Sequence, residues 1–270
     1  MKPKSKVLII AGSDSSGGAG IQADIKTVTA LGSYAMTAVT AVTLQNTQGV
    51  KGISPISTKN LEKQITMVLD DIGANAVKIG MLHNTQIIKC IYKILKKYNL
   101  KNIVLDPVMI AKGGTKLVNN NSIKYLKKLL IPLCSIITPN IPEAEVLTGY
   151  SISNKKDMIK AAQKILTMGA KNVLLKGGHL KNKMIFDILV SKKEIKIFPK
   201  RKIKTKNTHG TGCTLSSAIA TCLSQKKNIY KSCEASLNYV DKAILTAPGY
   251  GKGFGPLNHL VSFNLRNINA

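Results

Sequence analysis

The feature that most constrains the fold of this chain is the alternation of short, almost wholly apolar runs with longer segments of helical periodicity. The apolar runs are KVLIIAGSD, AVKIGML, NIVLDPVM, SIITPNIP and NVLLKGGH. Helical periodicity marks the segments NTQIIKCIYKILKKYN, NNNSIKYLKKLLIP and NKKDMIKAAQKILTMGA. Strands that are apolar on both faces belong to parallel sheets covered by helices on each side. The sequence therefore predicts an α/β fold, and because it contains no repeat or linker we expect a single domain over residues 1–270.

Two segments depart from this alternation. Residues 33–50, SYAMTAVTAVTLQNTQGV, are long and rich in β-branched side chains, which predicts a strand that lies at the sheet edge or returns over the sheet. Residues 184–210 alternate apolar and basic side chains on either side of a turn near Ser191. This second pattern predicts a half-exposed antiparallel pair of strands.

The formal net charge of +27 suggests a polyanionic partner, such as nucleic acid or an anionic membrane surface. However, Arg201 and Arg266 are the sole arginines among 40 basic residues, whereas proteins that read nucleic acid favour the planar guanidinium of arginine. The lysines are spread along the chain, often on the polar side of amphipathic runs, as is typical of solvated helix faces. A lysine-rich nucleic-acid-binding protein therefore stays an alternative from a different functional class.

The cysteines and the N-terminus indicate the compartment. The five cysteines include no C-x-x-C pair, so neither a zinc site nor a disulfide framework is expected. The start, MKPKSKVLIIAGSD, contains too few apolar residues for a signal sequence or a membrane span. We expect a soluble protein of the reducing cytoplasm.

Polar residues cluster where the predicted parallel strands end. They are Asp14, Asp106, Asn140, Glu143 and Lys176, with Gly177 beside them, and ligands of such sheets bind at the carboxyl ends of the strands. Asp106 and Glu143 offer the oxygen ligands that Mg²⁺ prefers, and Lys176 is a compact cation for phosphate oxygens. Each residue alone also has an ordinary structural explanation, as a turn aspartate, a first-turn helix glutamate or a surface lysine. Their shared position at one edge favours a common site.

The stretch NTHGTGCTLSSAIA places Gly210, Gly212 and Cys213 at the predicted start of a helix near Cys213. Glycines let an anion approach the backbone closely, and the unpaired amides and positive dipole end of a helix attract it. The pattern therefore predicts a phosphate site. The alternative is a glycine turn into a helix with a buried, inert cysteine.

A second glycine-rich loop, GSDSSGGAGIQADIK, also opens a predicted helix. It does not match the P-loop pattern G-x-x-x-x-G-K-[ST], which occurs nowhere in the chain. Asp24 lies one turn into this helix, and Gln45 ends the AVTLQ run. A carboxylate and an amide that converge could recognise an aminated heterocycle, although each alone is also typical of a surface or capping group.

These motifs together resemble the ribokinase-like superfamily, and more closely the bacterial hydroxymethylpyrimidine/phosphomethylpyrimidine kinases of thiamin biosynthesis. The resemblance is carried by AGSDSSGGAGIQADIKT, VTLQNTQGV, KIGML, VLDPVM, ITPNIPEAE, LLKGGH, NTHGTGCTLSSAIA and GKGFGP. It implies a three-layer αβα sandwich with a mostly parallel sheet and a small antiparallel edge element. It also implies a homodimer that uses ATP and Mg²⁺ to phosphorylate 4-amino-5-hydroxymethyl-2-methylpyrimidine and then its monophosphate. A pyridoxal or pyridoxine kinase of the same fold stays the near alternative.

The resemblance also implies a role for each matched residue. The ring of the substrate is held by Gln45, Asp24, Gly12, Met81 and Val108. The nucleotide is held by Asn140, Lys176, Thr208, Gly210 and Gly212, and the metal by Glu143 and, through water, Asp106. Catalysis falls to Gly210, Thr211, Gly212 and the amide of Cys213 as an anion hole, with Lys176 neutralising phosphate charge. Many superfamily members carry Asp at the position of Cys213, so the acceptor's base is expected to be a thiolate whose pKa the helix N-terminus lowers.

Overall fold

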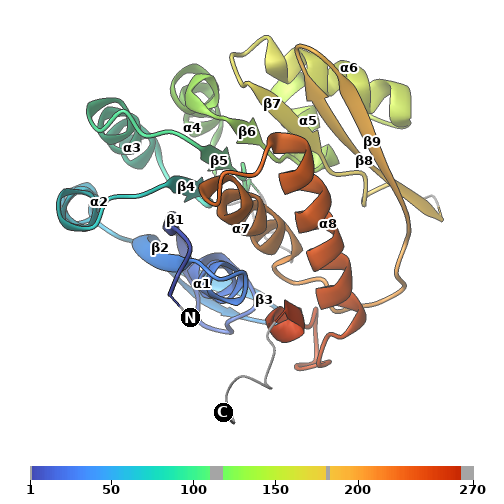
Figure 1. Cartoon of the computed structure of the whole chain (residues 1–270), viewed down its shortest axis with the longest axis horizontal. Helices are drawn as coiled ribbons and strands as arrows, with labels where there is room; N and C mark the ends of the chain where they lie inside the picture. Colours follow the sequence, from blue (N-terminus) through green and yellow to red (C-terminus); the bar gives the residue numbers. More distant parts are fainter. Residues whose placement is uncertain (1, 110–117, 181–182, 263–270) are drawn as a thin grey trace.

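The computed structural model describes residues 2–109, 118–180 and 183–262 and contains a nine-stranded sheet (Figure 1). The strand order is β3-β2-β1-β4-β5-β6-β7-β8-β9. The strands are β1 (Lys6–Asp14), β2 (Tyr34–Asn46), β3 (Gly49–Pro55), β4 (Ala76–Ile79), β5 (Ile103–Leu105), β6 (Ile136–Ile137), β7 (Asn172–Leu175), β8 (Met184–Ser191) and β9 (Ile195–Arg201).

The centre of the sheet is parallel and both edges are antiparallel. Strands β2, β1, β4, β5, β6 and β7 pair in parallel, whereas β3 runs antiparallel to β2, and β8 and β9 form an antiparallel pair beside β7. The five apolar runs form β1, β4, β5, β6 and β7, and the predicted pair around Ser191 is β8 and β9. The long β-branched segment forms β2, one strand in from the edge, because β3 turns back to cover it.

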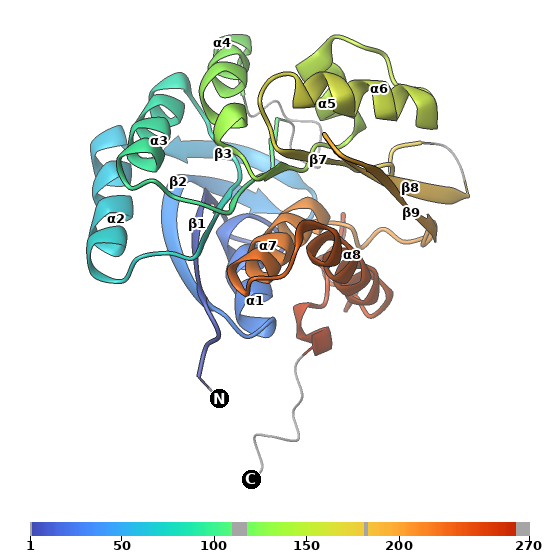
Figure 2. The same cartoon turned by 45° about the horizontal axis from the view of Figure 1, so that its top comes forward.

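The helices form two layers, one on each face of the sheet (Figure 2). They are α1 (Gly20–Ala30), α2 (Thr58–Asp71), α3 (Thr85–Lys97), α4 (Asn120–Tyr125), α5 (Ile141–Thr148), α6 (Lys155–Leu166), α7 (Thr211–Ser224) and α8 (Ile229–Leu245). A π-helical turn (Leu126–Leu130) and a 3-10 turn (Ile131–Leu133) follow α4, and a further 3-10 turn spans His259–Ser262.

Strand β1 shows how the sequence builds the two cores. Leu8 and Ile10 belong to the core on the side of α2 to α6, whereas Val7 and Ile9 belong to the core on the side of α1, α7 and α8. All four side chains are buried, as expected for a central strand whose alternate side chains point to opposite faces. The predicted three-layer αβα sandwich is confirmed.

Within the ranges that the structure describes, no helix is both long enough and apolar enough to cross a membrane.

Candidate active site

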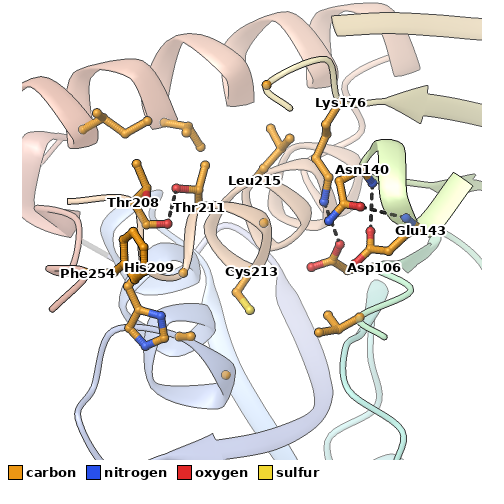
Figure 3. Close-up of a pocket in the computed structure, with 18 of the residues that line it drawn as sticks. Asp106, Asn140, Glu143, Lys176, Thr208, His209, Thr211, Cys213, Leu215 and Phe254 are labelled. Carbon is orange, nitrogen blue, oxygen red and sulfur yellow. Dashed lines mark hydrogen bonds and ion pairs between the residues drawn. The ribbon is translucent and has the colours of Figure 1, made fainter. Parts of the chain in front are cut away.

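One cavity of about 700 Å³ opens where the parallel strands end, and it gathers most of the predicted site residues (Figure 3). Both glycine-rich loops, the segments that follow β5, β6 and β7, and parts of β8, β9 and α8 line it. Its volume lies in the range of sites that enclose a small molecule and a cofactor. The loops thus meet at the carboxyl edge of the sheet, where the fold class predicts a ligand.

The anion-hole turn, residues 210–213, leads into α7. The helix begins at Thr211, two residues before the predicted start, and its N-cap Gly210 has a left-handed backbone with φ of 81°. A Cβ atom at Gly210 would overlap the carbonyl oxygen of Gly18, so glycine is required both for conformation and for space. Glycine has no side-chain oxygen to cap the helix. The Thr211 amide donates to the Thr208 carbonyl oxygen at 3.4 Å, so the amides of Gly212 and Cys213 are the ones that can face an anion at the cavity wall.

Asp106, Glu143 and Lys176 line the cavity beside this turn. Lys176 Nζ lies 3.1 Å from Asp106 Oδ1, and a Cβ atom at Gly212 would lie 3.2 Å from Lys176 Nζ and 3.3 Å from Asp106 Oδ2. Although burial lowers the pKa of Lys176, the carboxylates of Asp106 and Glu143 raise it above its ordinary value. The lysine is therefore a charged ammonium group close to the first turn of α7.

Asn140 and Glu143 form a capping box that begins α5. Asn140 Oδ1 accepts a hydrogen bond of 2.9 Å from the Glu143 amide, and Glu143 Oε2 accepts one of 2.8 Å from the Asn140 amide. This reciprocal pair orients the glutamate toward the cavity, since its carboxyl group is fixed from the backbone side. Burial, opposed by Lys176, together with the charge of Asp106 raises the pKa of Glu143 to about 7.

The two carboxyl groups fit a hard divalent cation. Asp106 and Glu143 are both nearly fully buried, and Lys176 is the cation that lies 3.1 Å from Asp106. Across the residues that the structure places, no group of three His, Cys, Asp or Glu could hold a metal ion. A cation there needs phosphate oxygens and water to complete its shell, which is the coordination that Mg²⁺ favours.

Cys213 lies on the first turn of α7 with its sulfur at the cavity (Figure 3). The prediction that the helix N-terminus lowers the pKa of Cys213 is wrong. Burial raises this pKa to about 12, and the charges of Asp24 and Asp106 add to that effect. Lys78 and the Gly20 amide oppose the rise but are outweighed. In this structure the thiol is neutral at pH 7.

Asp24 does not line the cavity, contrary to the prediction that it contacts the substrate ring. Its side chain is fully buried in α1, where Oδ2 lies 2.6 Å from Lys78 Nζ and Oδ1 accepts a hydrogen bond of 2.7 Å from Ser217. Lys78, on β4, reaches the cavity wall. Sequence reasoning missed Lys78, although a lysine inside the apolar run AVKIGML is a signal, because a charge buried in a strand needs a partner.

The other four predicted ring contacts line the cavity together: Gln45, Gly12, Met81 and Val108. Thr43 donates a hydrogen bond of 3.0 Å to Gln45 Oε1, which fixes the amide at the end of β2. Apolar walls and one oriented amide suit a flat ring that carries polar substituents.

Sequence reasoning also missed a buried hydrogen-bonded pair between the two glycine-rich loops. His209 Nε2 lies 2.8 Å from Asp14 Oδ2. Although burial raises the pKa of Asp14, hydrogen bonds from His209 and Ser16 lower it to about 2. The available signal was a histidine directly before GTG in one loop and an acid in the other.

A more apolar part of the cavity adjoins β8, β9 and α8. It is lined by Ile185, Ile203, Leu215, Leu237, Val240 and Ile244. Lys200 pairs there with Asp187 at 3.2 Å and with Asp241 at 2.9 Å, two contacts that the sequence did not predict. Thr208, a predicted nucleotide contact, lines the same cavity.

Residues 251–256, the GKGFGP segment, pack against the turn after β2. The Phe254 amide donates a hydrogen bond of 2.8 Å to the Thr47 carbonyl oxygen, and Phe254 lines the cavity. The segment therefore forms part of the cavity wall.

Comparison with known proteins identifies the family. The family model described as phosphomethylpyrimidine kinase matches residues 14–258. A thiamine biosynthesis bifunctional protein of Geobacter sulfurreducens is 46% identical over 96% of this chain, which spans 53% of that protein. A hydroxymethylpyrimidine/phosphomethylpyrimidine kinase of Bacillus subtilis is 44% identical, over 98% of each chain. The structure of a Staphylococcus aureus pyridoxal kinase in complex with ADP aligns with a TM-score of 0.90 and 32% identity, over 97% of this chain and 95% of that one. The chain belongs to the phosphomethylpyrimidine kinase family.

Proposed function

We propose that this protein transfers the γ-phosphoryl group of ATP to 4-amino-5-hydroxymethyl-2-methylpyrimidine and then to the resulting monophosphate, in thiamin biosynthesis. The observation that carries the proposal is the position of the anion-hole turn. It lies in one cavity between the charged residues Asp106 and Lys176 and the ring contacts Gln45 and Met81. A phosphate donor and a ring alcohol bound on either side face each other across that turn.

In this mechanism the protein acts mainly by positioning and by electrostatic stabilisation. Lys176 and the free amides of the anion-hole turn stabilise the negative charge that spreads over the transferring phosphoryl oxygens. Asp106 and Glu143 hold Mg²⁺, which when bound supplies positive charge beside the phosphates. Gln45 orients the pyrimidine through its substituents, and Met81 packs on its ring.

The neutral thiol of Cys213 changes the role expected for that residue. We propose that its sulfur accepts a hydrogen bond from the acceptor hydroxyl and orients that oxygen for in-line attack. The new O–P bond forms as the bond to the ADP oxygen breaks, and the hydroxyl proton passes to a phosphate oxygen. In a loose transition state the bond between the attacking oxygen and phosphorus is still weak, so a base is needed little to remove the hydroxyl proton.

The experiment that tests the function supplies purified protein with ATP, Mg²⁺ and the pyrimidine alcohol, and follows the mono- and diphosphate products by chromatography. Successive appearance of both is expected. Absence of the diphosphate would limit the function to the first step.

Pyridoxal kinase activity is the second candidate, favoured by the likeness to the Staphylococcus aureus enzyme. Both acceptors carry a hydroxymethyl group on a nitrogen heteroaromatic ring. The ratio of kcat/KM for the pyrimidine and for pyridoxal, measured in one assay, decides between them. A ratio well below one would reverse our assignment.

The homodimer is proposed from the family resemblance, the single domain from the lack of a repeat or linker in the sequence, and the cytoplasmic location from the cysteine pattern. Sedimentation of the purified protein tests the dimer. The nucleic-acid alternative predicts duplex binding tighter than ATP binding at physiological salt, with a steep loss as salt rises. We expect no such binding.

A further inference from the structure

We propose that Asp14 and His209 form a positioning pair that fixes the acceptor loop, residues 12–20, against the anion-hole turn, residues 210–213. The inference rests on the proposed function and adds two residues that act through others. Neither is assigned to contact the transferring phosphoryl group.

The pair joins segments far apart in the chain. The two side chains are 3% and 6% exposed, and His209 Nε2 lies 2.8 Å from Asp14 Oδ2. Since both groups are almost removed from water, their mutual hydrogen bond is costly to leave unmade.

Asp14 also closes the acceptor loop on itself. Its Oδ1 accepts hydrogen bonds from the amide and hydroxyl of Ser16, at 2.9 and 2.7 Å. Its Oδ2 accepts from the amides of Gly18 and Ala19, at 3.1 and 2.7 Å, in addition to the contact with His209. One carboxylate therefore sets both the shape of the loop and its attachment to the partner loop.

The two backbones also touch beside the pair. A Cβ atom at Gly18 would collide with His209 Cδ2, and one at Gly210 would overlap the Gly18 carbonyl oxygen. The Gly18 backbone thus packs directly on both the His209 ring and the Gly210 backbone, so a change in one loop displaces the other.

On the substrate side His209 has one further backbone anchor and one side-chain neighbour. Its ring nitrogen Nε2, whose proton faces Asp14, lies 3.3 Å from the side-chain nitrogen of Gln45, a proposed ring contact, so the two groups are neighbours. Its backbone amide donates a hydrogen bond of 3.1 Å to the Gly255 carbonyl oxygen. The residue directly before the anion-hole turn is therefore bonded to the acceptor loop and to the Gly255 segment and lies beside the ring site, which aligns the acceptor oxygen with the phosphoryl group.

The first test is steady-state kinetics of His209→Ala and His209→Gln. Small misalignments cost up to about 100-fold in rate, so we expect His209→Ala to lower kcat by about 10- to 100-fold. The KM for ATP should change less than about threefold, because the His209 side chain lies against Asp14, and the variant keeps the neighbouring nucleotide contacts Thr208 and Gly210. Glutamine keeps an N–H donor for Asp14, and His209→Gln should recover most of the lost kcat.

Lys26→Ala is the matched control. Lys26 Nζ donates a hydrogen bond of 2.9 Å to the Gly17 carbonyl oxygen from the exposed side of the same loop. Its removal disturbs the loop without touching the pair, and kcat should stay within about twofold of wild type. In the double variant Asp14→Asn/His209→Ala, the loss should be no greater than in the more affected single variant.

A second readout does not depend on which acceptor the enzyme uses. The other four cysteines are buried, whereas Cys213 is half-buried at the anion-hole turn. In His209→Ala the turn is released, and Cys213 should react with iodoacetamide about threefold faster or more. Mass spectrometry measures the alkylation rate, and His209→Gln should react at the wild-type rate.

These readouts separate the two proposals. Absence of pyrimidine phosphorylation in the wild type, together with faster alkylation in His209→Ala, would reject the proposed substrate and support the pair. Unchanged alkylation in a His209→Ala protein that unfolds at the wild-type temperature would overturn the pair. So would a kcat loss equal in the alanine and glutamine variants, or additive losses in the double variant.

Discussion

Lys78 Nζ lies 2.6 Å from Asp24 Oδ2, and both side chains are fully buried between the sheet and α7. Although burial lowers the pKa of Lys78, the charge of Asp24 raises it above its ordinary value. Burial, opposed by Lys78 and Ser217, raises the pKa of Asp24. The pair, with Ser217, ties α1, β4 and α7 together beneath the cavity.

Removal of one partner of this pair should destabilise the fold strongly. We expect Lys78→Met to lower the free energy of unfolding by about 3 to 5 kcal/mol, because Asp24 is left buried and unpaired. In the double variant Lys78→Met/Asp24→Asn the loss should be smaller than in the single lysine variant, since no isolated charge remains. Urea unfolding of the three proteins measures this, and a larger loss in the double variant would contradict the prediction.

This pair also shows where sequence reasoning ends. The apolar runs predicted the parallel strands correctly, because burial on both faces leaves a pattern that local sequence carries. The position of Asp24 one turn into a helix was compatible with an exposed group, and its partner lies 54 residues further along the chain. Nothing in the local sequence distinguishes a carboxylate that faces a ligand from one that faces a buried lysine.

The pKa of Cys213 is likewise a property that the local sequence does not predict. The place of this residue on the first turn of α7 was predicted to within two residues, and a helix N-terminus does favour a thiolate. The opposing effects, burial and the charges of Asp24 and Asp106, come from segments that only the folded structure brings near. In such a case the pKa follows the tertiary surroundings, so the sequence predicted the position of the residue and not its protonation.

Substitutions of Cys213 test whether the thiol orients the acceptor or acts as a thiolate base. If the neutral thiol orients the acceptor oxygen, Cys213→Ser should keep kcat within about tenfold of wild type, whereas Cys213→Ala loses about 10- to 100-fold. Nucleotide binding should be unchanged in both, as measured by calorimetry. Equal inactivity of the two variants, with thiolate absorbance appearing near pH 7 in the wild type, would restore the thiolate base.

Glu143→Gln tests how much the negative charge of Glu143 contributes to the proposed metal site. Glutamine keeps a side-chain oxygen for the Asn140 amide, which the native glutamate contacts at 2.8 Å, so the start of α5 is preserved. We expect the half-saturating Mg²⁺ concentration for activity to rise about tenfold or more, with less than about 1 kcal/mol change in the free energy of unfolding.

Asn140→Ala is the matched comparison for that variant. It removes the side-chain cap and leaves the carboxylate, so it should cost about 1 kcal/mol of stability with a smaller effect on Mg²⁺. The reverse ranking of the two variants in Mg²⁺ dependence would show that the capping box, and not the charge of Glu143, supports the metal.

Lys176→Met tests the proposed electrostatic role at the anion-hole turn. Methionine keeps much of the length and volume of the side chain but lacks the charge that lies 3.1 Å from Asp106. We expect kcat to fall by about 10²- to 10³-fold, because phosphoryl charge is then less well compensated in the transition state. Steady-state kinetics measure this, and a change confined to the KM for ATP would indicate ground-state binding instead.

His259 should make the fold sensitive to mild acid. Its ring lies 3.0 Å from the Thr214 hydroxyl in α7, and burial, with a contribution from Lys26, lowers the pKa of His259 to about 4 from an ordinary 6.5. Between these values the unfolded chain binds more protons than the native one, so the free energy of unfolding decreases as pH falls through this window and is fully retained above it. The difference of about 2.5 pH units corresponds to about 3 kcal/mol. Urea unfolding at pH 7.5, 5.5 and 4.5 measures how steeply the free energy of unfolding changes with pH. This dependence should be shallower in His259→Gln, because glutamine is uncharged and its amide can still bond Thr214. Equal dependence in the two proteins would assign the acid sensitivity to other groups.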